Sequence, residues 1–256
     1  MLRNLSLLIG LSMIAGLAKA DTITLTLQEY PPYMGEKIPY QGLLTRAVLA
    51  AFDSQGIEVV LKSVPNNRAI EGARRGAYDG SFGWARNPDR EKDLLYTNPV
   101  IALQMVFCHR SNQDYPWKKM ADLAPYSIGI TTGNYYSDDF SKLQTSGVLK
   151  VDAAASDAAN FKKLLAGHID LFPIDAEVAP YLMAMHLTKA ERAQLSCQKK
   201  AYWEAPLHVV INKRNPNAER WIAAFNAGLA KLEKSGQLQQ LFALTREELY
   251  QTAQKP

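Results

Sequence analysis

The sequence predicts an α/β protein made of two similar lobes that face each other across a cleft. Segments with the apolar pattern of strands alternate with segments of helical periodicity between residues 22 and 82, and the alternation restarts at residue 126. Such alternation is typical of βαβ units and a mostly parallel sheet. No low-complexity linker divides the chain, and 256 residues fit one large domain or two small lobes.

The first twenty residues have the pattern of a secretion signal. Arg3 provides a positive start, residues 5–17 form an apolar run, and Ala18-Lys19-Ala20 supplies small residues before a cleavage site. The run is short for a transmembrane helix, and an uncleaved anchor is the alternative interpretation. We expect cleavage after Ala20 and a mature chain that is exported to the periplasm.

The charge balance and the missing motifs exclude several classes of function. Removal of residues 1–20 takes away Arg3 and Lys19 and no acidic residue, which lowers the formal net charge from +4 to +2. That charge is too small to indicate nucleic-acid binding, and no basic cluster with interleaved aromatic residues occurs. The four histidines are scattered, and no Cys-x-x-Cys pair, phosphate-binding loop or nucleophile elbow is present. We therefore expect no metal, no cofactor and no catalysis.

The first α/β unit is predicted to run strand, helix, strand, helix, strand. Threonine alternates with apolar residues in the first strand, and the first helix, which Gly42 opens, has an apolar stripe on one face. Gly76 ends the second helix. The strands are predicted at 22–27, 59–61 and 79–82, the second helix at 67–75, and the stripe of the first helix at Leu44, Ala47, Val48, Ala51 and Phe52.

The second unit repeats this order, and further elements follow it. Ser156 has the chemistry of a helix N-cap and Gly167 that of a helix end. A strongly amphipathic helix that ends at Gly236 comes near the end of the chain. The strands are predicted at 126–131, 148–152, 169–174 and 207–211, and the helices at 137–143, 156–166, 175–185, around 221–232 and at 238–250.

Cys108 and Cys197 are the only two cysteines of the chain. In an exported protein they are expected to form a disulfide, and two buried free thiols are the alternative. Both lie close to the predicted crossovers between the lobes, so we hypothesise that the bond ties the hinge. A bond that closes a loop of this length stabilises the fold by about 4 to 5 kcal/mol in the chain-entropy model.

One loop carries the residues that point most clearly to a ligand. Trp84, Arg86 and Arg90 follow the third predicted strand. A guanidinium group matches a carboxylate with two parallel hydrogen bonds, so this loop is suited to a small anion. Because Asp89 and Glu91 flank Arg90, a solvated face of salt bridges is the alternative.

Three further strand ends provide candidate ligand contacts. Tyr30 and Tyr33 follow the first strand, where their rings either pack on a ligand or form a rigid surface turn. Asn134 and Tyr135 lie in a loop that leads from a strand into a helix, where backbone N–H groups favour an anion. Asp175 follows an apolar strand and acts either as a helix N-cap or as a partner for an ammonium group. An arginine on one lobe and an aspartate on the other match the two ends of an amino acid.

These segments resemble the periplasmic solute-binding proteins of the polar amino-acid type, the family 3 receptors of ABC importers. The similarity extends over nearly all of the mature chain and rests on the order and spacing of several short motifs. They are the Tyr30 to Tyr33 turn, Gly76 with Tyr78 and Asp79, Asn87 to Arg90, Tyr96 to Val100, Asp122-Leu123, Ile128 to Ile130 with Gly133, Gly167 to Asp175, Lys213 to Pro216, and Leu232 to Gly236.

The resemblance implies a type II periplasmic-binding-protein-like fold, with two α/β lobes joined by a two-strand hinge. One lobe is expected at residues 21–108 plus 204–256 and the other at 109–203. Arg90 is implied to hold a ligand carboxylate and Asp175 the α-amino group, with Tyr30 on the side chain. Because Gly83-Trp84-Ala85-Arg86 and Tyr135 depart from the family's usual residues, either Arg86 or Arg90 remains a candidate for the carboxylate.

The resemblance also implies a function. The chain is expected to capture a small zwitterion or carboxylate, an amino acid above all, as a monomer, and to deliver it to an ABC permease in the inner membrane. The alternatives are a sensory receptor without a permease and a periplasmic enzyme of the same fold, such as a cyclohexadienyl or prephenate-type dehydratase. Such an enzyme requires a general acid, for which Glu29 and Glu177 are the nearby candidates.

Overall fold

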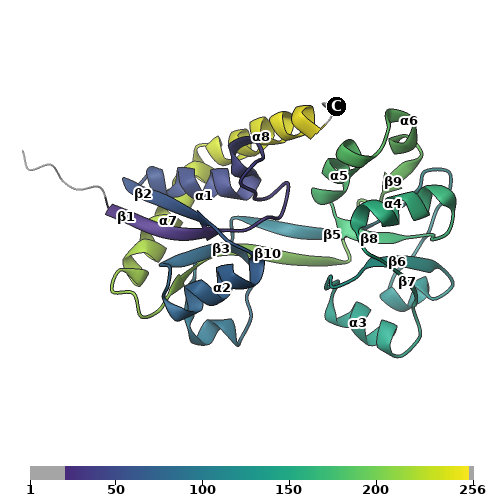
Figure 1. The fold of residues 1–256 in the computed structure, drawn as a ribbon, viewed down its shortest axis with the longest axis horizontal. Coiled ribbons are helices and arrows are strands. Elements are labelled where there is room, and N and C mark those ends of the chain that lie inside the picture. The colour runs from purple at the N-terminus through teal and green to yellow at the C-terminus, as the bar shows by residue number, and fades with distance from the viewer. Residues whose placement is uncertain (1–20, 254–256) are drawn as a thin grey trace, which may run out of the picture.

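Two α/β lobes lie beside each other and are joined by two long strands (Figure 1). The structure is a computed structural model that describes residues 21–253, so the predicted signal segment lies outside the described residues. The joining strands are β5 (Ile101–Arg110) and β10 (Trp203–Asn212), which pair antiparallel between residues 101–105 and 203–207. The two-strand connection between the lobes is therefore present, while the residue limits of the lobes stay a prediction.

Lobe 1 is built on a sheet in which β1 lies between two parallel neighbours. The strand order is β2-β1-β3-β10, and β4 pairs with the far end of β10. Because β10 returns from the other lobe, it runs antiparallel to β3. The strands are β1 (Asp21–Leu27), β2 (Ile57–Ser63), β3 (Gly80–Trp84) and β4 (Leu94–Tyr96).

Helices cover both faces of this sheet (Figure 1). Three of them pack together on one face, where the rings of Phe52 and Phe225 lie 5.0 Å apart. The apolar stripe predicted for the first helix is confirmed, since all five of its residues are fully buried. The helices are α1 (Leu43–Asp53), α7 (Ala218–Lys234) and α8 (Gln237–Ala253) on that face and α2 (Asn66–Arg75) on the other, with 3-10 turns at Pro39–Gln41 and Arg90–Lys92.

Lobe 2 contains the second α/β unit. Strand β6 pairs parallel with β7 on one side and meets Leu171, next to β8, on the other. Ser156 accepts a hydrogen bond from Ala159 N, and Gly167 adopts φ 74°, which confirms the predicted start and end of α4. The elements are β6 (Ser127–Thr131), β7 (Lys150–Ala154), β8 (Phe172–Asp175), β9 (Leu195–Cys197), α3 (Asp138–Thr145), α4 (Asp157–Ala166), α5 (Val178–His186), α6 (Lys189–Arg192) and a 3-10 turn at Met120–Leu123.

The disulfide between Cys108 and Cys197 is present, and it lies on the lobe 2 side of the two crossing strands, although the predicted lobe limits assigned Cys108 to lobe 1. Cys108 of β5 stands directly opposite Cys197 of β9, with a Cα–Cα distance of 3.9 Å. Cys108 also pairs with Phe172 of β8. Because the bond joins neighbouring strands of one lobe, the hypothesis that it ties the hinge is wrong.

Helix α8 extends from lobe 1 to the side of lobe 2 and packs against α5 (Figure 1). Arg246 of α8 donates to Glu177, which immediately precedes α5, from Nε to Oε2 at 3.0 Å and from Nη2 to Oε1 at 2.5 Å. A bidentate pair of this kind fixes the relative orientation of its two groups. It therefore connects the lobes in the arrangement seen here.

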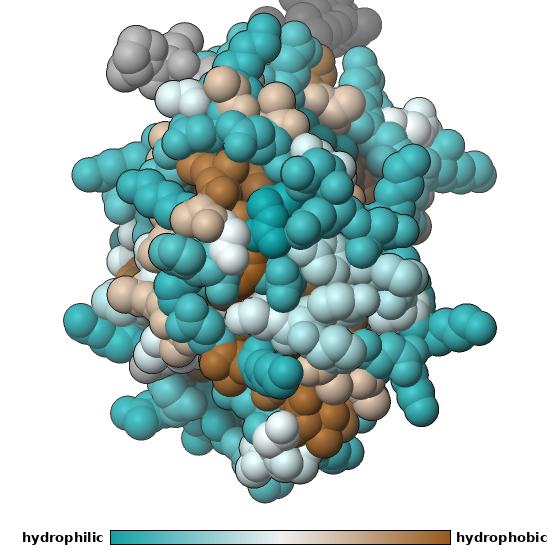
Figure 2. All heavy atoms as spheres, turned by 90° about the vertical axis from the view of Figure 1, so that its right-hand side faces the viewer, coloured by the Kyte–Doolittle hydropathy of each residue, from teal (hydrophilic) through white to brown (hydrophobic). Residues whose placement is uncertain are grey.

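The end of the molecule formed by lobe 2 is mainly hydrophilic (Figure 2). On this face the apolar residues form separate patches among polar and charged side chains, rather than one continuous surface. Within residues 21–253, no helix combines the length and the apolar character that crossing a membrane requires.

Two differences from the predicted elements matter for the site. Strand β5 was not predicted as an element, although it forms one of the two connections. The helix expected from residue 175 begins at Val178, because Asp175 still pairs with Met105 as the last residue of β8. Tertiary pairing with β5 thus extends the strand beyond the local helix signal.

Replacing Gly228 by alanine is expected to lower the free energy of unfolding by about 1 to 3 kcal/mol. A Cβ atom there would lie 2.1 Å from the backbone oxygen of Ala51, where helices α7 and α1 touch. Helix propensity alone predicts the opposite sign, a gain of about 1 kcal/mol. Urea unfolding measures the change. The control is Ala227→Gly at the neighbouring exposed position, which should lose stability through helix propensity alone. A Gly228→Ala variant that is more stable than the wild type would show that the two helices are free to separate.

Candidate functional site

A cavity of about 380 Å³ lies between the lobes, at the ends of strands from both. Loops that follow strands converge at this edge of an open α/β sheet, which is why ligands bind there. Tyr30 comes after β1 and Trp84 ends β3, while Asp175 ends β8. The lining residues are Tyr30, Trp84, Leu103, Met105, Gly133, Asn134, Tyr135, Tyr136, Asp157, Pro173, Ile174, Asp175, Val178 and Trp203.

Asp175 is the most buried acidic group of the cavity. Its side chain is 2 % exposed and accepts four hydrogen bonds. The Oδ1 atom accepts from Tyr33 Oη at 2.8 Å, Glu177 N at 2.9 Å and Val178 N at 3.1 Å, and Oδ2 accepts from Gln104 N at 2.8 Å. Burial raises the pKa of Asp175 above the usual value, and these hydrogen bonds oppose the rise. Among the described residues, no lysine or arginine forms an ion pair with it.

The two tyrosines after β1 occupy different depths. Their rings stack with centroids 5.6 Å apart, and Tyr30 lines the cavity while Tyr33 is fully buried behind it. Tyr33 donates to Asp175 from the other lobe. Burial raises the pKa of Tyr30, and the negative charges of Asp175 and Asp157 raise it further. The tyrosines therefore belong to the boundary between the lobes, and not to a surface turn.

Strand β3 presents Trp84 to the cavity, and the loop that follows the strand keeps Arg86 and Arg90 out of the cavity lining. Trp84 donates from Nε1 to Ser81 Oγ at 2.7 Å. The Cζ atom of Arg90 lies 4.8 Å from the centroid of the Trp84 ring, so Arg90 is next to a lining residue without lining the cavity itself. Arg86 is exposed and pairs with Glu91 at 3.0 Å. In this arrangement neither guanidinium reaches Asp175.

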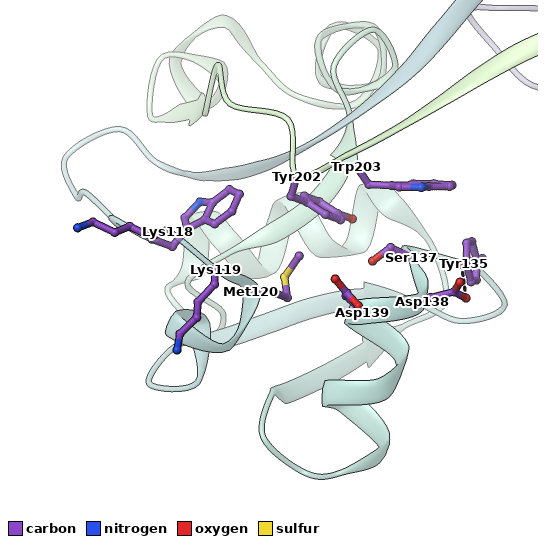
Figure 3. Close-up of a pocket in the computed structure, with 10 residues that line it drawn as sticks. Lys118, Lys119, Met120, Tyr135, Ser137, Asp138, Asp139, Tyr202 and Trp203 are labelled. Carbon is purple, nitrogen blue, oxygen red and sulfur yellow. Dashed lines mark hydrogen bonds between the residues drawn. The ribbon is translucent and has the colours of Figure 1, made fainter.

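A second cavity, of about 460 Å³, adjoins the first on the side of lobe 2 (Figure 3). Tyr135 and Trp203 line both cavities, and their rings meet edge to face with centroids 5.5 Å apart. Tyr135 Oη donates to Asp138 Oδ1 at 2.8 Å. All residues of the second cavity come from lobe 2 and the start of β10, so only the first cavity receives side chains from both lobes. We therefore take the first as the candidate site.

Sequence reasoning missed several lining residues. Asp157 is the first residue of α4 and follows β7, so the rule that places ligands at strand ends was sufficient to select it. Tyr136 lies next to Tyr135, and its hydroxyl accepts from Thr131 N at 2.6 Å. Met105 and Trp203 carried no local signal, because the pairing of β5 with β10 brings them to the cavity.

The two glutamates considered as general acids do not line the cavity. Glu177 is held by Arg246, as described above, and Glu29 accepts a hydrogen bond from Glu36 N at 2.8 Å. Within residues 21–253 no group of three or more His, Cys, Asp or Glu side chains has the arrangement of a metal site. The candidate site is a polar and aromatic cavity.

Comparison with known families identifies the chain. The model of the bacterial extracellular solute-binding proteins, family 3, matches residues 23–243. The chain belongs to this family. The match spans both lobes and agrees with the resemblance read from the short motifs. The members of this family are extracellular solute-binding proteins, which favours a location outside the cytoplasm for this protein. A search of curated protein sequences found no match.

Solved structures share the type II periplasmic-binding-protein-like fold of this solute-binding protein. The second substrate-binding domain of a putative amino acid ABC transporter from Streptococcus pneumoniae has 18% identity and a TM-score of 0.67, with 87% of this chain and 98% of that chain covered. An ancestral arginine-binding protein has 18% identity and a TM-score of 0.63, with coverages of 87% and 96%. Substrate-binding domain 2 of GlnP from Lactococcus lactis, in an open conformation, has 17% identity and a TM-score of 0.66, with coverages of 88% and 95%.

Proposed function

We propose that this protein captures an amino acid in the cavity between its lobes and delivers it to an ABC permease of the inner membrane. The protein acts in the periplasm, after removal of its signal segment, as a monomer that binds its ligand without chemical turnover. The observation that carries the proposal is the position of the cavity, which takes its lining from both lobes and both crossing strands. A ligand that contacts both lobes stabilises their closed arrangement.

The kinds of protein that share the fold support an amino acid as the ligand. One similar structure comes from a putative amino acid ABC transporter, and another is an ancestral protein bound to arginine. The buried carboxylate of Asp175 supports the same conclusion. A buried carboxylate is favourable when a cation pairs with it, and the ammonium group of an amino acid provides that cation. Asp175 therefore receives the α-amino group in our proposal.

The other predicted contacts are distributed around the same cavity. Tyr30 and Trp84 offer ring surfaces to the ligand, and Asn134 and Tyr135 contribute from lobe 2. Arg90 is the better candidate for the carboxylate, since it lies against Trp84 while Arg86 is paired with Glu91. For Arg90 to reach the ligand, its side chain has to leave the ring face of Trp84.

A thermal-shift series over the twenty amino acids and small carboxylates tests the function. Ligand at one hundred times its dissociation constant should stabilise the protein by about 2.7 kcal/mol. In Arg90→Ala the shift should be lost, whereas Arg86→Ala, the matched control on the same loop, should keep it. Equal shifts in both variants would reject Arg90 as the carboxylate ligand. No shift for any compound, with protein first unfolded and refolded to remove bound solutes, would contradict amino-acid capture itself.

A further inference from the structure

The described lining of the cavity between the lobes contains two carboxylates and no basic side chain. Asp157 and Asp175 are its only charged lining residues among those described, and Arg90 lies over the ring of Trp84 without lining the cavity. One α-amino group satisfies one carboxylate. When Asp175 receives that group, the half-buried carboxylate of Asp157 remains without a cationic partner at the lining of the cavity.

The position of Asp157 is set by a chain of hydrogen bonds. Asn160 Nδ2 donates to Thr131 Oγ1 at 3.0 Å, so the hydroxyl proton of Thr131 is directed to Asp157 Oδ1, which accepts it. Asn160 is fully buried one turn further along α4. These hydrogen bonds assign Asp157 Oδ1 as an acceptor, and no hydrogen bond to the second oxygen of this cavity-lining residue is described.

Aromatic rings surround the same end of the cavity. Tyr136 is 4 % exposed and is fixed by Thr131 N, and Tyr135 and Trp203 meet edge to face beside it. Tyr30 from lobe 1 lines the same cavity as both carboxylates; burial raises the pKa of Tyr30, and the charges of Asp175 and Asp157 raise it further. The electron-rich faces of such rings attract a cation, most strongly where water is excluded.

Stabilisation of the start of helix α4 is not a sufficient explanation for the position of Asp157. An acidic residue in the first turn of a helix stabilises the helix, because its negative charge interacts favourably with the helix dipole. Asp138 occupies the same position in α3. However, the N-cap hydrogen bond of α4 is made by Ser156, and Asp157 is the residue that reaches the lining of the cavity between the lobes. Its carboxylate is therefore available to a ligand.

We propose that the ligand carries a second positive charge, a side-chain ammonium or guanidinium group, which lies between Asp157 and the rings of Tyr30, Tyr135 and Tyr136. This inference rests on the proposed function and narrows it to cationic amino acids. Asp175 holds the α-amino group, and the side-chain cation pairs with Asp157. A neutral side chain of the same size leaves Asp157 unpaired and binds more weakly.

Isothermal titration of the refolded wild-type protein with two matched pairs of probes tests the charge. Arginine and citrulline differ by one charged end group at nearly equal size, and lysine and norleucine differ in the same way. We expect the cationic member of at least one pair to bind at least about tenfold more tightly, the factor that corresponds to about 1.4 kcal/mol. Equal affinity within both pairs would overturn the inference and leave amino-acid capture intact.

The variant Asp157→Asn tests the residue. Asparagine retains an oxygen that accepts from Thr131, so the helix start is preserved while the charge is removed. Affinity for the cationic probe should fall about tenfold or more, with little change for the neutral probe. The control is Asp139→Asn, the same change in charge in the first turn of α3, in the second cavity only (Figure 3). Equal losses in the two variants would overturn the assignment to Asp157.

The two proposals fail in different ways. If neutral amino acids bind as well as cationic ones, only the second charge is rejected. If none of the four probes and no compound of the wider amino-acid series binds, both are rejected. If Asp157→Asn does not fold, as judged by circular dichroism, the comparison within the probe pairs on the wild-type protein still decides the matter.

Discussion

Replacing Cys108 and Cys197 together by alanine is expected to lower the free energy of unfolding by about 4 to 5 kcal/mol. The bond joins residues 89 positions apart, and its loss gives the unfolded chain the freedom of that long loop. For a chain of this size the melting temperature should fall by roughly 10–15 °C. Denaturant unfolding of the double variant measures the change.

Reduction of the wild-type protein provides the control for this result. Fully reduced wild-type protein should approach the stability of the double variant, and oxidised protein should not. Because the bond lies on the lobe 2 side of the crossing strands, the stabilisation by a saturating amino acid should be the same with and without it. A double variant within about 1 kcal/mol of the wild type would contradict the chain-entropy account, and a lost ligand response would restore the hinge hypothesis.

Replacing Asp175 by alanine is expected to abolish the ligand-induced thermal shift and to lower stability by about 2 to 4 kcal/mol. The change removes the proposed partner of the α-amino group. It also leaves Tyr33 Oη and the N–H groups of Gln104, Glu177 and Val178 without their acceptor in a buried site. The alanine variant no longer buries a carboxylate, and the free energy regained in this way offsets only part of the lost stability. Titration calorimetry and urea unfolding measure the two effects.

The variant Asp175→Asn separates charge from shape, and its pH dependence has a defined sign. Because burial raises the pKa of Asp175, the folded protein binds more protons than the unfolded chain between the usual and the raised value. The unfolding free energy of the wild type should therefore fall as the pH rises through that window, relative to Asp175→Asn. An asparagine variant with unchanged affinity and an unchanged pH profile would remove Asp175 from the proposed site.

Local signals in the sequence were sufficient for elements whose contacts are short in range. The stripe from Leu44 to Phe52 predicted the buried face of α1, and the Ser156 and Gly167 signals marked the ends of α4. Strand ends also located Tyr30, Trp84 and Asp175 at one cavity. Each of these inferences rests on periodicity or capping within a few residues.

Contacts between distant segments were not predictable in this way. The hydrogen bond from Tyr33 to Asp175 joins residues 142 positions apart, and Met105 reaches the site only because β5 pairs with β10 and β8. The arginine loop shows the same limit, since its charges suggested a carboxylate site while the structure directs Arg86 to Glu91 and Arg90 to the ring of Trp84.

The sequence by itself determined the two α/β units, the family and the strand ends that line the cavity, because hydrophobic periodicity and turn chemistry are local properties of the chain. Only the tertiary structure decided which side chains share the cavity, that Asp157 and Asp175 are the charged residues of its described lining, and that the disulfide joins β5 to β9. These depend on the register of strands far apart in the sequence, and a shift of one residue in that register turns a side chain to the opposite face.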